Sequence, residues 1–193
     1  MKVESIVLGS IGTNCYIVTN EETKECFAVD MAECPQEYVN YIKNNGLEMK
    51  ALFLTHGHFD HIMGIDDFLK AFPVPVYAGE DELPVIEDDR LNVSSMYGPK
   101  YAFHGAQPVR DGQVIECAGI EVDVLQTPGH TVGGCCYYLP KEHRLFSGDT
   151  LFCASIGRTD LPTGSSSQLV RSVQEKIMTL PDDTKIYPGH MEE

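Results

Sequence analysis

Long apolar runs are missing from this sequence. No stretch approaches the ~20 apolar residues that a helix needs to cross a bilayer. The apolar run at the amino terminus is interrupted by Glu4 and ends at Gly9, which is too short for a secretion signal. We therefore expect a cytoplasmic protein with no membrane partner.

Basic residues are also scarce. The chain carries 14 lysines and arginines against 29 aspartates and glutamates, which gives a formal net charge of -15. Such a charge repels the phosphate backbone of nucleic acids, so no nucleic-acid partner is expected. A strongly acidic surface more often serves solubility than the attraction of a cationic partner.

Cysteines are present, but they lack the patterns that would give them a structural role. They stand at positions 15, 26, 34, 117, 135, 136 and 153. They form neither the paired framework of a secreted domain nor a Cys-x-x-Cys zinc pattern. We expect free thiols in a reducing compartment, with the adjacent Cys135 and Cys136 buried in a strand.

The remaining composition is that of an ordinary globular protein. At 193 residues, with 42% apolar and 22% charged side chains, the chain can bury one substantial core. No internal repeat or low-complexity segment divides it. We therefore predict a single domain over residues 1–193 and leave its oligomeric state open.

Strand and helix patterns alternate irregularly along the chain. Runs typical of strands stand at 3–8, 14–19, 25–30, 51–54, 73–77, 113–117, 120–126, 134–139, 143–147 and 185–187. Helical spacing marks 35–46, 65–72 and 165–178, and serines predict a capped start for the last of these. The segment 91–111 lacks periodicity and is expected to form a long connection at a pocket rim. This order predicts an α+β fold in which two sheets pack face to face with helices outside.

One short segment carries a dense set of metal-ligand side chains. His56, His58, Asp60 and His61 follow the apolar run 51–54, where a strand is expected to lead into a helix. Side chains two apart on an extended segment point the same way, so His56 and His58 can bind one ion. Asp60 and His61, at the start of the helix, face a slightly different point. An isolated histidine would be an ordinary surface residue and Asp60 alone a helix cap, but their density predicts two adjacent metal ions.

Three later strand ends share one pattern, in which the strand leads into a glycine turn that presents a single ligand. The segments are 127–131, 146–150 and 187–190, and they present His130, Asp149 and His190. Taken singly, each residue would most often be structural, since histidine and aspartate are common at turns. Beside the dense segment, the three together indicate one larger site.

These motifs resemble those of the metallo-β-lactamase-fold hydrolases, and within that superfamily the chain is similar to the short glyoxalase II-like proteins. The resemblance rests on residues 55–61, His130, Gly148-Asp149-Thr150 and Gly189-His190, in the family's order along nearly the whole chain. It implies an αββα sandwich of two mixed β-sheets with a two-metal site at one edge. It assigns His56, His58 and His130 to one ion, Asp60, His61 and His190 to the other, and Asp149 as the bridge.

The resemblance also implies the chemistry of a binuclear hydrolase. Two divalent ions, zinc before iron or manganese, would hold a bridging hydroxide and polarise a carbonyl of a small-molecule substrate. Asp60 and Asp149 are the carboxylates expected to take part in catalysis. A thiolate departs without much protonation, and the sequence offers no obvious general acid, so we predict a small thioester or related ester as substrate.

The loop 155–164 resembles that of the short hydrolases and persulfide dioxygenases more than that of full-length glyoxalase II. Arg158 in this loop is a candidate for binding a substrate carboxylate, or else it pairs with Asp160 to shape the loop. Full-length glyoxalase II adds a C-terminal helical domain that supplies glutathione-binding residues, and this chain ends three residues after His190. A glutathione-containing substrate and a truncation after His190 therefore stay open.

Two other functions fit the same residues. Persulfide dioxygenases share the fold and much of the motif but use a single iron held by two histidines and one aspartate, with open positions for oxygen. A metal-stabilised binding module without catalysis is the third possibility. The motif does not separate the three, whereas metal analysis, oxygen uptake and turnover would.

Overall fold

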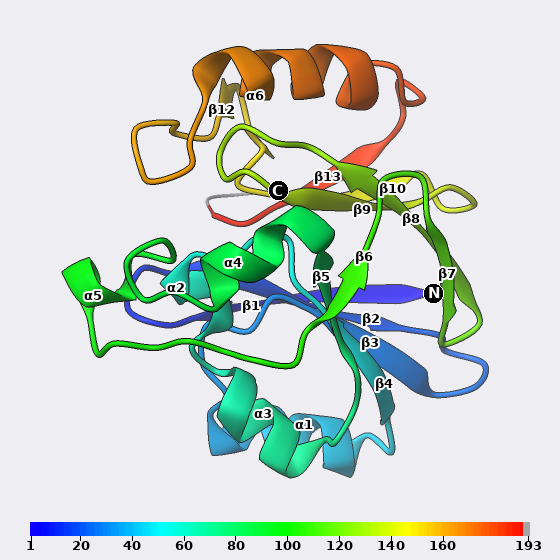
Figure 1. Ribbon diagram of the computed structural model, residues 1–193. Coiled ribbons are helices and arrows are strands. Elements are labelled where there is room, and N and C mark those ends of the chain that lie inside the picture. The colour runs from blue at the N-terminus through cyan, green and yellow to red at the C-terminus, as the bar shows by residue number, and fades with distance from the viewer. Residues whose placement is uncertain (191–193) are drawn as a thin grey trace.

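The computed structural model describes residues 1–190 and shows two β-sheets packed face to face between layers of helices (Figure 1). Helices α1 (Gln36–Asn44) and α3 (Ile65–Ala71) cover the outer face of the first sheet, and α6 (Ser166–Ser172) covers the second. This arrangement confirms the predicted αββα sandwich of the α+β class.

The first sheet has six strands in the order β1-β2-β3-β4-β5-β6. They are β1 (Lys2–Leu8), β2 (Thr13–Thr19), β3 (Glu25–Val29), β4 (Glu48–Phe53), β5 (Val76–Gly79) and β6 (Gln107–Val109). The first three pair antiparallel across short turns, whereas β3 to β6 run parallel because helices and longer segments connect them. The carboxyl ends of β3, β4 and β5 therefore meet at one edge of the sheet.

The second sheet has the order β13-β10-β9-β8-β7. Its strands are β7 (Val114–Cys117), β8 (Ile120–Gln126), β9 (Cys135–Leu139), β10 (Arg144–Gly148) and β13 (Lys185–Pro188). Strands β7 to β10 pair antiparallel in chain order, and β13 returns parallel to β10. A separate ribbon of β11 (Leu151–Phe152) and β12 (Ser155–Ile156) follows β10. Both sheets are thus mixed, as the resemblance implied.

Alternating side chains on the central strands fill the core on both faces. On β2, Ile17 packs toward α1 and α3, while Tyr16 packs between the sheets. On β9, Tyr137 lies between the sheets and Tyr138 faces the α6 layer. Because strand side chains alternate, a strand buried on both faces is apolar along almost its whole length. This packing fixes the two sheets against each other at the edge where β4, β10 and β13 end.

The middle of the chain has more structure than the sequence pattern predicts. The segment 91–111 contains α5 (Ser94–Tyr97) and β6, which are four and three residues long and too short to show a period. The acidic stretch before it forms a 3₁₀ turn, η1 (Glu80–Glu82), and the short helix α4 (Leu83–Ile86).

The helix expected after the dense ligand segment is divided in two. A separate helix, α2 (Phe59–Ile62), carries Asp60 and His61, and α3 begins only at Ile65. Gly64 separates them because its N–H donates to the Met31 carbonyl at 2.9 Å, and a Cβ there would lie 2.6 Å from the Glu33 carbonyl carbon. A tertiary backbone contact therefore ends α2.

The last helix differs at both ends from its prediction. Ser165 precedes α6 but makes no side-chain capping hydrogen bond, so the predicted cap is wrong. Its hydroxyl lies 3.4 Å from the Ser167 hydroxyl instead. From Val173 to Ile177 the helix continues as a π-helical turn, η2 (Val173–Ile177).

All seven cysteines are free thiols, and Cys135 and Cys136 are buried in β9 as expected. Over residues 1–190, the helices are too short or too polar for any of them to span a membrane.

Candidate metal centre

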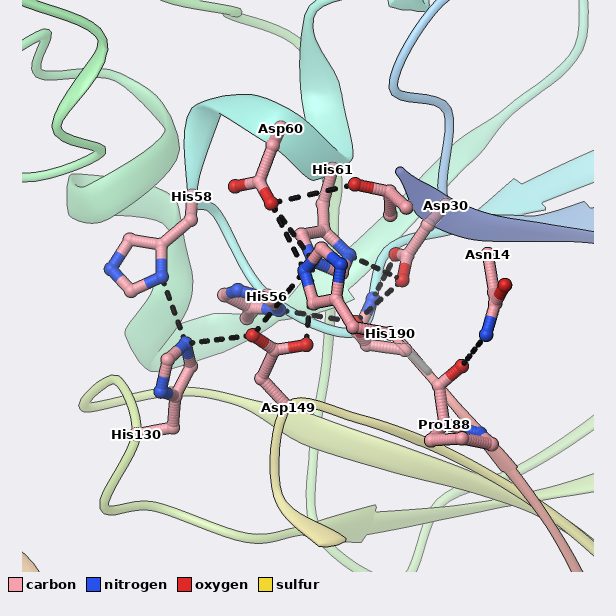
Figure 2. A network of polar contacts seen from close by, with 12 residues as sticks. Asn14, Asp30, His56, His58, Asp60, His61, His130, Asp149, Pro188 and His190 are labelled. Atoms are coloured by element: carbon pink, nitrogen blue, oxygen red, sulfur yellow. Dashed lines mark hydrogen bonds and ion pairs between the residues drawn. The ribbon is translucent and has the colours of Figure 1, made fainter. Parts of the chain in front are cut away.

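The side chains predicted as ligands converge at the edge where strands of both sheets end (Figure 2). They are His56 and His58 directly after β4, Asp60 and His61 on α2, His130 between β8 and β9, Asp149 after β10, and His190 after β13. The backbone N–H of Gly189 donates to the Gly148 carbonyl at 2.8 Å, which joins the ends of β10 and β13. The structure therefore brings all of the predicted ligand side chains together.

Three imidazoles form one group, called here the three-histidine group: His56, His58 and His130. All three side chains are buried, and their ligand nitrogens lie within 4.8 Å of one another. His58 Nδ1 lies 2.9 Å from His130 Nε2. His58 therefore faces the centre with Nδ1, whereas His130 faces it with Nε2.

Asp60, His61 and His190 form a second group, called here the Asp60 group. His190 Nε2 lies 3.1 Å from Asp60 Oδ2 and 3.3 Å from His61 Nε2. His61 Nε2 lies 3.7 Å from the same Asp60 oxygen. These atoms converge on one point beside the three-histidine group.

Asp149 lies between the two groups (Figure 2). Its Oδ2 is 3.5 Å from His130 Nε2 and 3.6 Å from His190 Nε2, and its Oδ1 is 3.5 Å from His61 Nε2. A Cβ at Gly189 would lie 2.3 Å from Asp149 Oδ1, so only glycine lets the His190 turn come this close. Asp149 is thus within reach of both groups.

The spacing of these atoms fits metal coordination. Nitrogen atoms bound to one tetrahedral zinc ion at about 2.0–2.1 Å lie about 3.3 Å apart. The separations from 2.9 Å for His58–His130 to 3.7 Å for His61–Asp60 bracket this value. His56 Nε2 is buried and has no hydrogen-bond partner in the described part of the chain, which costs free energy unless a ligand satisfies it. The residues present therefore fit two divalent ions.

Hydrogen bonds on the far side of the rings orient them. His61 Nδ1 donates to Asp30 Oδ2 at 2.8 Å, and His130 Nδ1 donates to the backbone carbonyl of Arg158 at 2.7 Å. A proton held on Nδ1 leaves the Nε2 lone pair free to face the centre. Both rings are thereby fixed in the tautomer and orientation that a metal ligand needs.

Asp30 is a site residue that the sequence analysis missed. It directly follows β3, its side chain is buried and its φ is 58°. Its carboxylate accepts the Thr55 N–H at 2.8 Å, the Thr55 hydroxyl at 2.7 Å and His61 Nδ1. The available signal was a carboxylate at the end of an apolar strand, since such a group is rarely buried without partners.

Strand β2 supports the turn that carries His190. The Asn14 N–H donates to the Gly189 carbonyl at 2.8 Å. Asn14 Nδ2 and the Tyr16 hydroxyl donate to the Pro188 carbonyl at 3.1 and 2.6 Å. The turn that carries His190 is therefore held from within the first sheet.

The two groups differ in their titration. Burial lowers the pKa of the three histidines in the three-histidine group, to about 3 at His58. In the Asp60 group, burial by itself would lower the pKa of His61. The carboxylates of Asp30 and Asp60 outweigh this effect and raise the pKa of His61 well above its usual value. Against the same burial effect, His61 and His190 hold the pKa of Asp60 well below its usual range. The first group thus offers uncharged donors, and the second is a network of opposite charges.

A cavity of about 480 Å³ opens onto the centre. It is lined by Ile11, His58, Phe59, Asp60, Val93, Tyr97, His130, Asp149, Phe152, Arg158, Leu161 and His190. Val93 and Tyr97 confirm that the segment 91–111 contributes to a pocket rim. Arg158 lines the cavity and also pairs with Asp160, from Nε to Oδ1 at 2.7 Å and from Nη2 to Oδ2 at 3.0 Å. One conformation of Arg158 is therefore compatible with both roles considered for it, which are binding a substrate carboxylate and pairing with Asp160.

Comparisons with known proteins agree with this fold and centre. The family profile described as the Metallo-beta-lactamase superfamily matches residues 8–190. The chain therefore belongs to the metallo-β-lactamase superfamily, with a His/Asp cluster suited to divalent metal ions.

Its relatives include proteins named as hydrolases. "Probable metallo-hydrolase YqgX" of Bacillus subtilis strain 168 is 34% identical over 98% of this chain and 90% of its own length. The crystal structure of BLEG-1, described as a B3 metallo-beta-lactamase, has 36% identity and a TM-score of 0.93 over 99% of this chain and 92% of that chain. The structure of TTHA1623 in a di-iron-bound form has 30% identity and a TM-score of 0.84 over 98% and 92% of the two chains.

Proposed function

We infer that this chain is a binuclear metal-dependent hydrolase of a small thioester or related ester, in the manner of the glyoxalase II-like proteins. The observation that carries this inference is the position of Asp149. Its carboxylate lies within 3.6 Å of imidazole nitrogens from both groups of ligands. A carboxylate shared in this way suits two ions held about 3.5–4 Å apart, the spacing of two-metal hydrolytic sites.

When bound, two divalent ions lower the pKa of a water toward neutrality and polarise a substrate carbonyl. The chain's own residues set the geometry around that water. Asp60 lines the cavity, and its carboxylate stays ionised because His61 and His190 hold its pKa low against the opposing effect of burial. Beyond binding metal, Asp60 is therefore suited to accept a hydrogen bond from the attacking water and orient it.

The cavity favours a small substrate with an apolar part. Its walls beside the ligands are mostly apolar, and they include Phe59, Val93 and Phe152. Arg158 supplies a cation at the same cavity, and we propose that it binds a substrate carboxylate. Its pairing with Asp160 is exposed to solvent, so the guanidinium can also bind such a group. A thiolate leaving group suits this site because it departs without a proton donor of its own.

We propose zinc as the metal, with iron or manganese as the alternatives. Imidazole nitrogens and carboxylate oxygens bind zinc, iron and manganese alike, so the donor atoms alone do not distinguish among these three metals. TTHA1623, which is 30% identical to this chain, is described in a di-iron-bound form, and this supports iron as an alternative. Metal content is therefore measured before any assay is interpreted.

A substrate panel on protein of measured metal content tests the proposal. The panel contains a thioester, an ester or lactone, a phosphodiester and a β-lactam, the last because BLEG-1 is described as a B3 metallo-beta-lactamase. We expect two metal ions per chain and the highest kcat/KM on the thioester, lost in His58→Ala and Asp149→Ala. His104→Ala is the matched control, since His104 is exposed and pairs only loosely with Glu87.

Three results would contradict the proposal. Metal at background level, or turnover unchanged in both variants, would show that this site is not a hydrolytic metal centre. Tightly bound metal without turnover on any panel member would instead support a binding module.

One observation favours an oxidoreductase as the second candidate. His56, His61 and Asp149 form a set of two histidines and one carboxylate whose ligand atoms lie within 4.8 Å of one another. Such a set holds iron in many oxygen-using enzymes. A persulfide dioxygenase-like activity predicts one iron per chain and oxygen uptake with a persulfide substrate, whereas the hydrolase consumes no oxygen.

A further inference from the structure

A buried carboxylate outside the metal centre links the two loops that carry the three-histidine group. Glu82 is the last residue of η1, and its side chain is fully buried. Its Oε1 accepts the N–H of Gly57 at 2.7 Å, and its Oε2 accepts the N–H of Gly133 at 2.8 Å. Both carboxylate oxygens are therefore bonded to backbone, each to a different loop.

Those two loops come from different sheets. Gly57 stands between His56 and His58 on the loop after β4, and Gly133 follows His130 by three residues on the connection between β8 and β9. Glu82 thereby joins the first sheet to the second at the edge where the ligands meet. Every ligand of the three-histidine group lies within three residues of an amide that this carboxylate holds.

The loops fit closely against the segment that carries Glu82. A Cβ on Gly57 would lie 2.8 Å from Ile86 Cγ1, and a Cβ on Gly133 would lie 2.1 Å from the Glu82 backbone nitrogen. Glycine at both positions is what allows the two backbones to come within hydrogen-bonding distance of one side chain. The contact is therefore a tight three-way packing of backbone around a carboxylate.

The Asp60 group is held differently. Its ring-orienting carboxylate is Asp30, and the His190 turn is supported from β2. Within residues 1–190, no hydrogen bond joins Glu82 to Asp60, His61 or His190. A change at Glu82 should accordingly reach one half of the centre and leave the other half intact.

We propose that Glu82 is a positioning residue for the three-histidine group, which it holds so that His56, His58 and His130 converge on one ion. This inference rests on the metal binding proposed above. Hydrogen bonds from N–H groups to a carboxylate are roughly twice as strong as neutral ones and gain further strength when buried. Loss of such an outer partner typically weakens metal binding by about 10–100-fold.

The test uses Glu82→Gln in two backgrounds. Glutamine keeps the size of the side chain, but its amide nitrogen cannot accept a hydrogen bond, so one of the two loops loses its partner. The backgrounds are His190→Ala, which leaves the three-histidine group complete, and His58→Ala, which leaves the Asp60 group complete. Co²⁺ binding is followed through the visible absorption of the bound ion. Glu80→Gln is the matched control, because Glu80 lies on the same turn, is exposed and pairs with Arg110.

We expect Glu82→Gln to weaken Co²⁺ binding about 10–100-fold and to alter the absorption spectrum in the His190→Ala background only. Glu80→Gln should change neither. Equal weakening in both backgrounds would reduce Glu82 to a general stabiliser of the fold, and unchanged binding in both would also overturn the proposal. Absence of Co²⁺ binding by the unmodified protein would overturn the proposed function itself.

A second measurement covers a Glu82→Gln variant that does not fold. Amide hydrogen exchange in the unmodified, metal-free protein reports on Gly57 and Gly133 directly. We expect both amides to be protected, since both are bonded to a buried carboxylate. Rapid exchange at either amide would overturn the proposal.

Discussion

The two halves of the metal centre differ in their donors, in their exposure and in what holds them. The three-histidine group offers imidazole nitrogens alone, and all of its side chains are buried. The Asp60 group combines a carboxylate with two imidazoles, and both Asp60 and His190 are partly exposed to the cavity. Glu82 joins the loops of the first group, whereas Asp30 orients His61 in the second.

This difference shows how one fold positions two adjacent groups of donor atoms by separate means. The first sheet supplies four of the ligands on one continuous segment, and the second sheet supplies His130, Asp149 and His190 from three strand ends. Each half therefore depends on contact between the sheets. Asp149 lies within 3.6 Å of imidazole nitrogens from both halves, so substitutions at other ligand positions are the ones that should separate the halves.

The largest effect is expected from Asp149→Ala. Removal of the shared carboxylate takes a ligand from both groups, so we expect metal content to fall from two ions to fewer than one per chain. Thioester turnover should fall by about 10³-fold or more, beyond the 10–100-fold that loss of an outer partner costs. Metal analysis and kcat/KM measure this. Retention of one tightly bound ion would show that Asp149 belongs to one half only.

His58→Ala and His190→Ala form the pair that divides the centre. Each variant removes one imidazole from a different half, so each should bind one metal ion per chain instead of two. The remaining ion should keep its affinity, because neither residue is a ligand in the other half. Loss of both ions in either variant would show that the two halves bind metal as one cooperative unit, which would contradict the expectation that each half binds its ion independently.

A smaller effect is expected from Asp30→Asn. Asparagine has only one acceptor oxygen and no negative charge, so it cannot accept all three hydrogen bonds that the carboxylate takes from the Thr55 N–H, the Thr55 hydroxyl and His61, and it holds His61 less strongly. We expect metal binding to the Asp60 group to weaken about 10–100-fold while the three-histidine group is unchanged. Asp67→Asn, at an exposed carboxylate that pairs with Lys70, is the control. Equal weakening of metal binding in both halves would show that Asp30 stabilises the fold in general and does not specifically orient His61.

The convergence of the candidate ligands could be predicted from the sequence because their signal is local. Five of them stand within one residue of a glycine in the turn after a strand, as at His130 and His190, and Asp60 and His61 follow His58 by two and three residues. The strands that carry them were predicted for the same reason, since a buried strand such as β2 shows its pattern within seven residues. Strand and ligand patterns that repeat within a few residues need no knowledge of the tertiary structure.

The residues that hold the ligands have no such local signal. Asp30 bonds to Thr55, 25 residues away, and Glu82 bonds to Gly133, 51 residues away. In the sequence, Asp30 is only the last residue of the strand-like run 25–30, and Glu82 lies among other acidic residues. The division of the predicted helix at Gly64 has the same origin, because its backbone contact with Met31 exists only in the folded chain. Contacts of this kind are set by how the two sheets and their loops meet, so a single sequence does not reveal them.

The last prediction concerns the stability of the fold and not metal binding, and it measures what the burial of the Glu82 carboxylate costs. Burial raises the pKa of Glu82 from 4.5 to about 7, although the Gly57 and Gly133 amides oppose the shift. Between these pH values the unfolded chain has released the proton that the folded chain keeps, so unfolding free energy falls as pH rises. A pKa raised from 4.5 to about 7 corresponds to about 3 kcal/mol of unfolding free energy.

We expect the unfolding free energy of the chelator-treated protein to fall by about this amount relative to that of Glu82→Gln between pH 4.5 and pH 7, as measured by urea unfolding. Parallel curves for the two proteins would mean that Glu82 is no more costly to ionise than a surface glutamate. An ionised Glu82 that lowers the stability of the fold at neutral pH, yet accepts hydrogen bonds from Gly57 and Gly133, gives the fold no net benefit. Its proposed role in positioning the three-histidine group accounts for its presence better than a role in stability does.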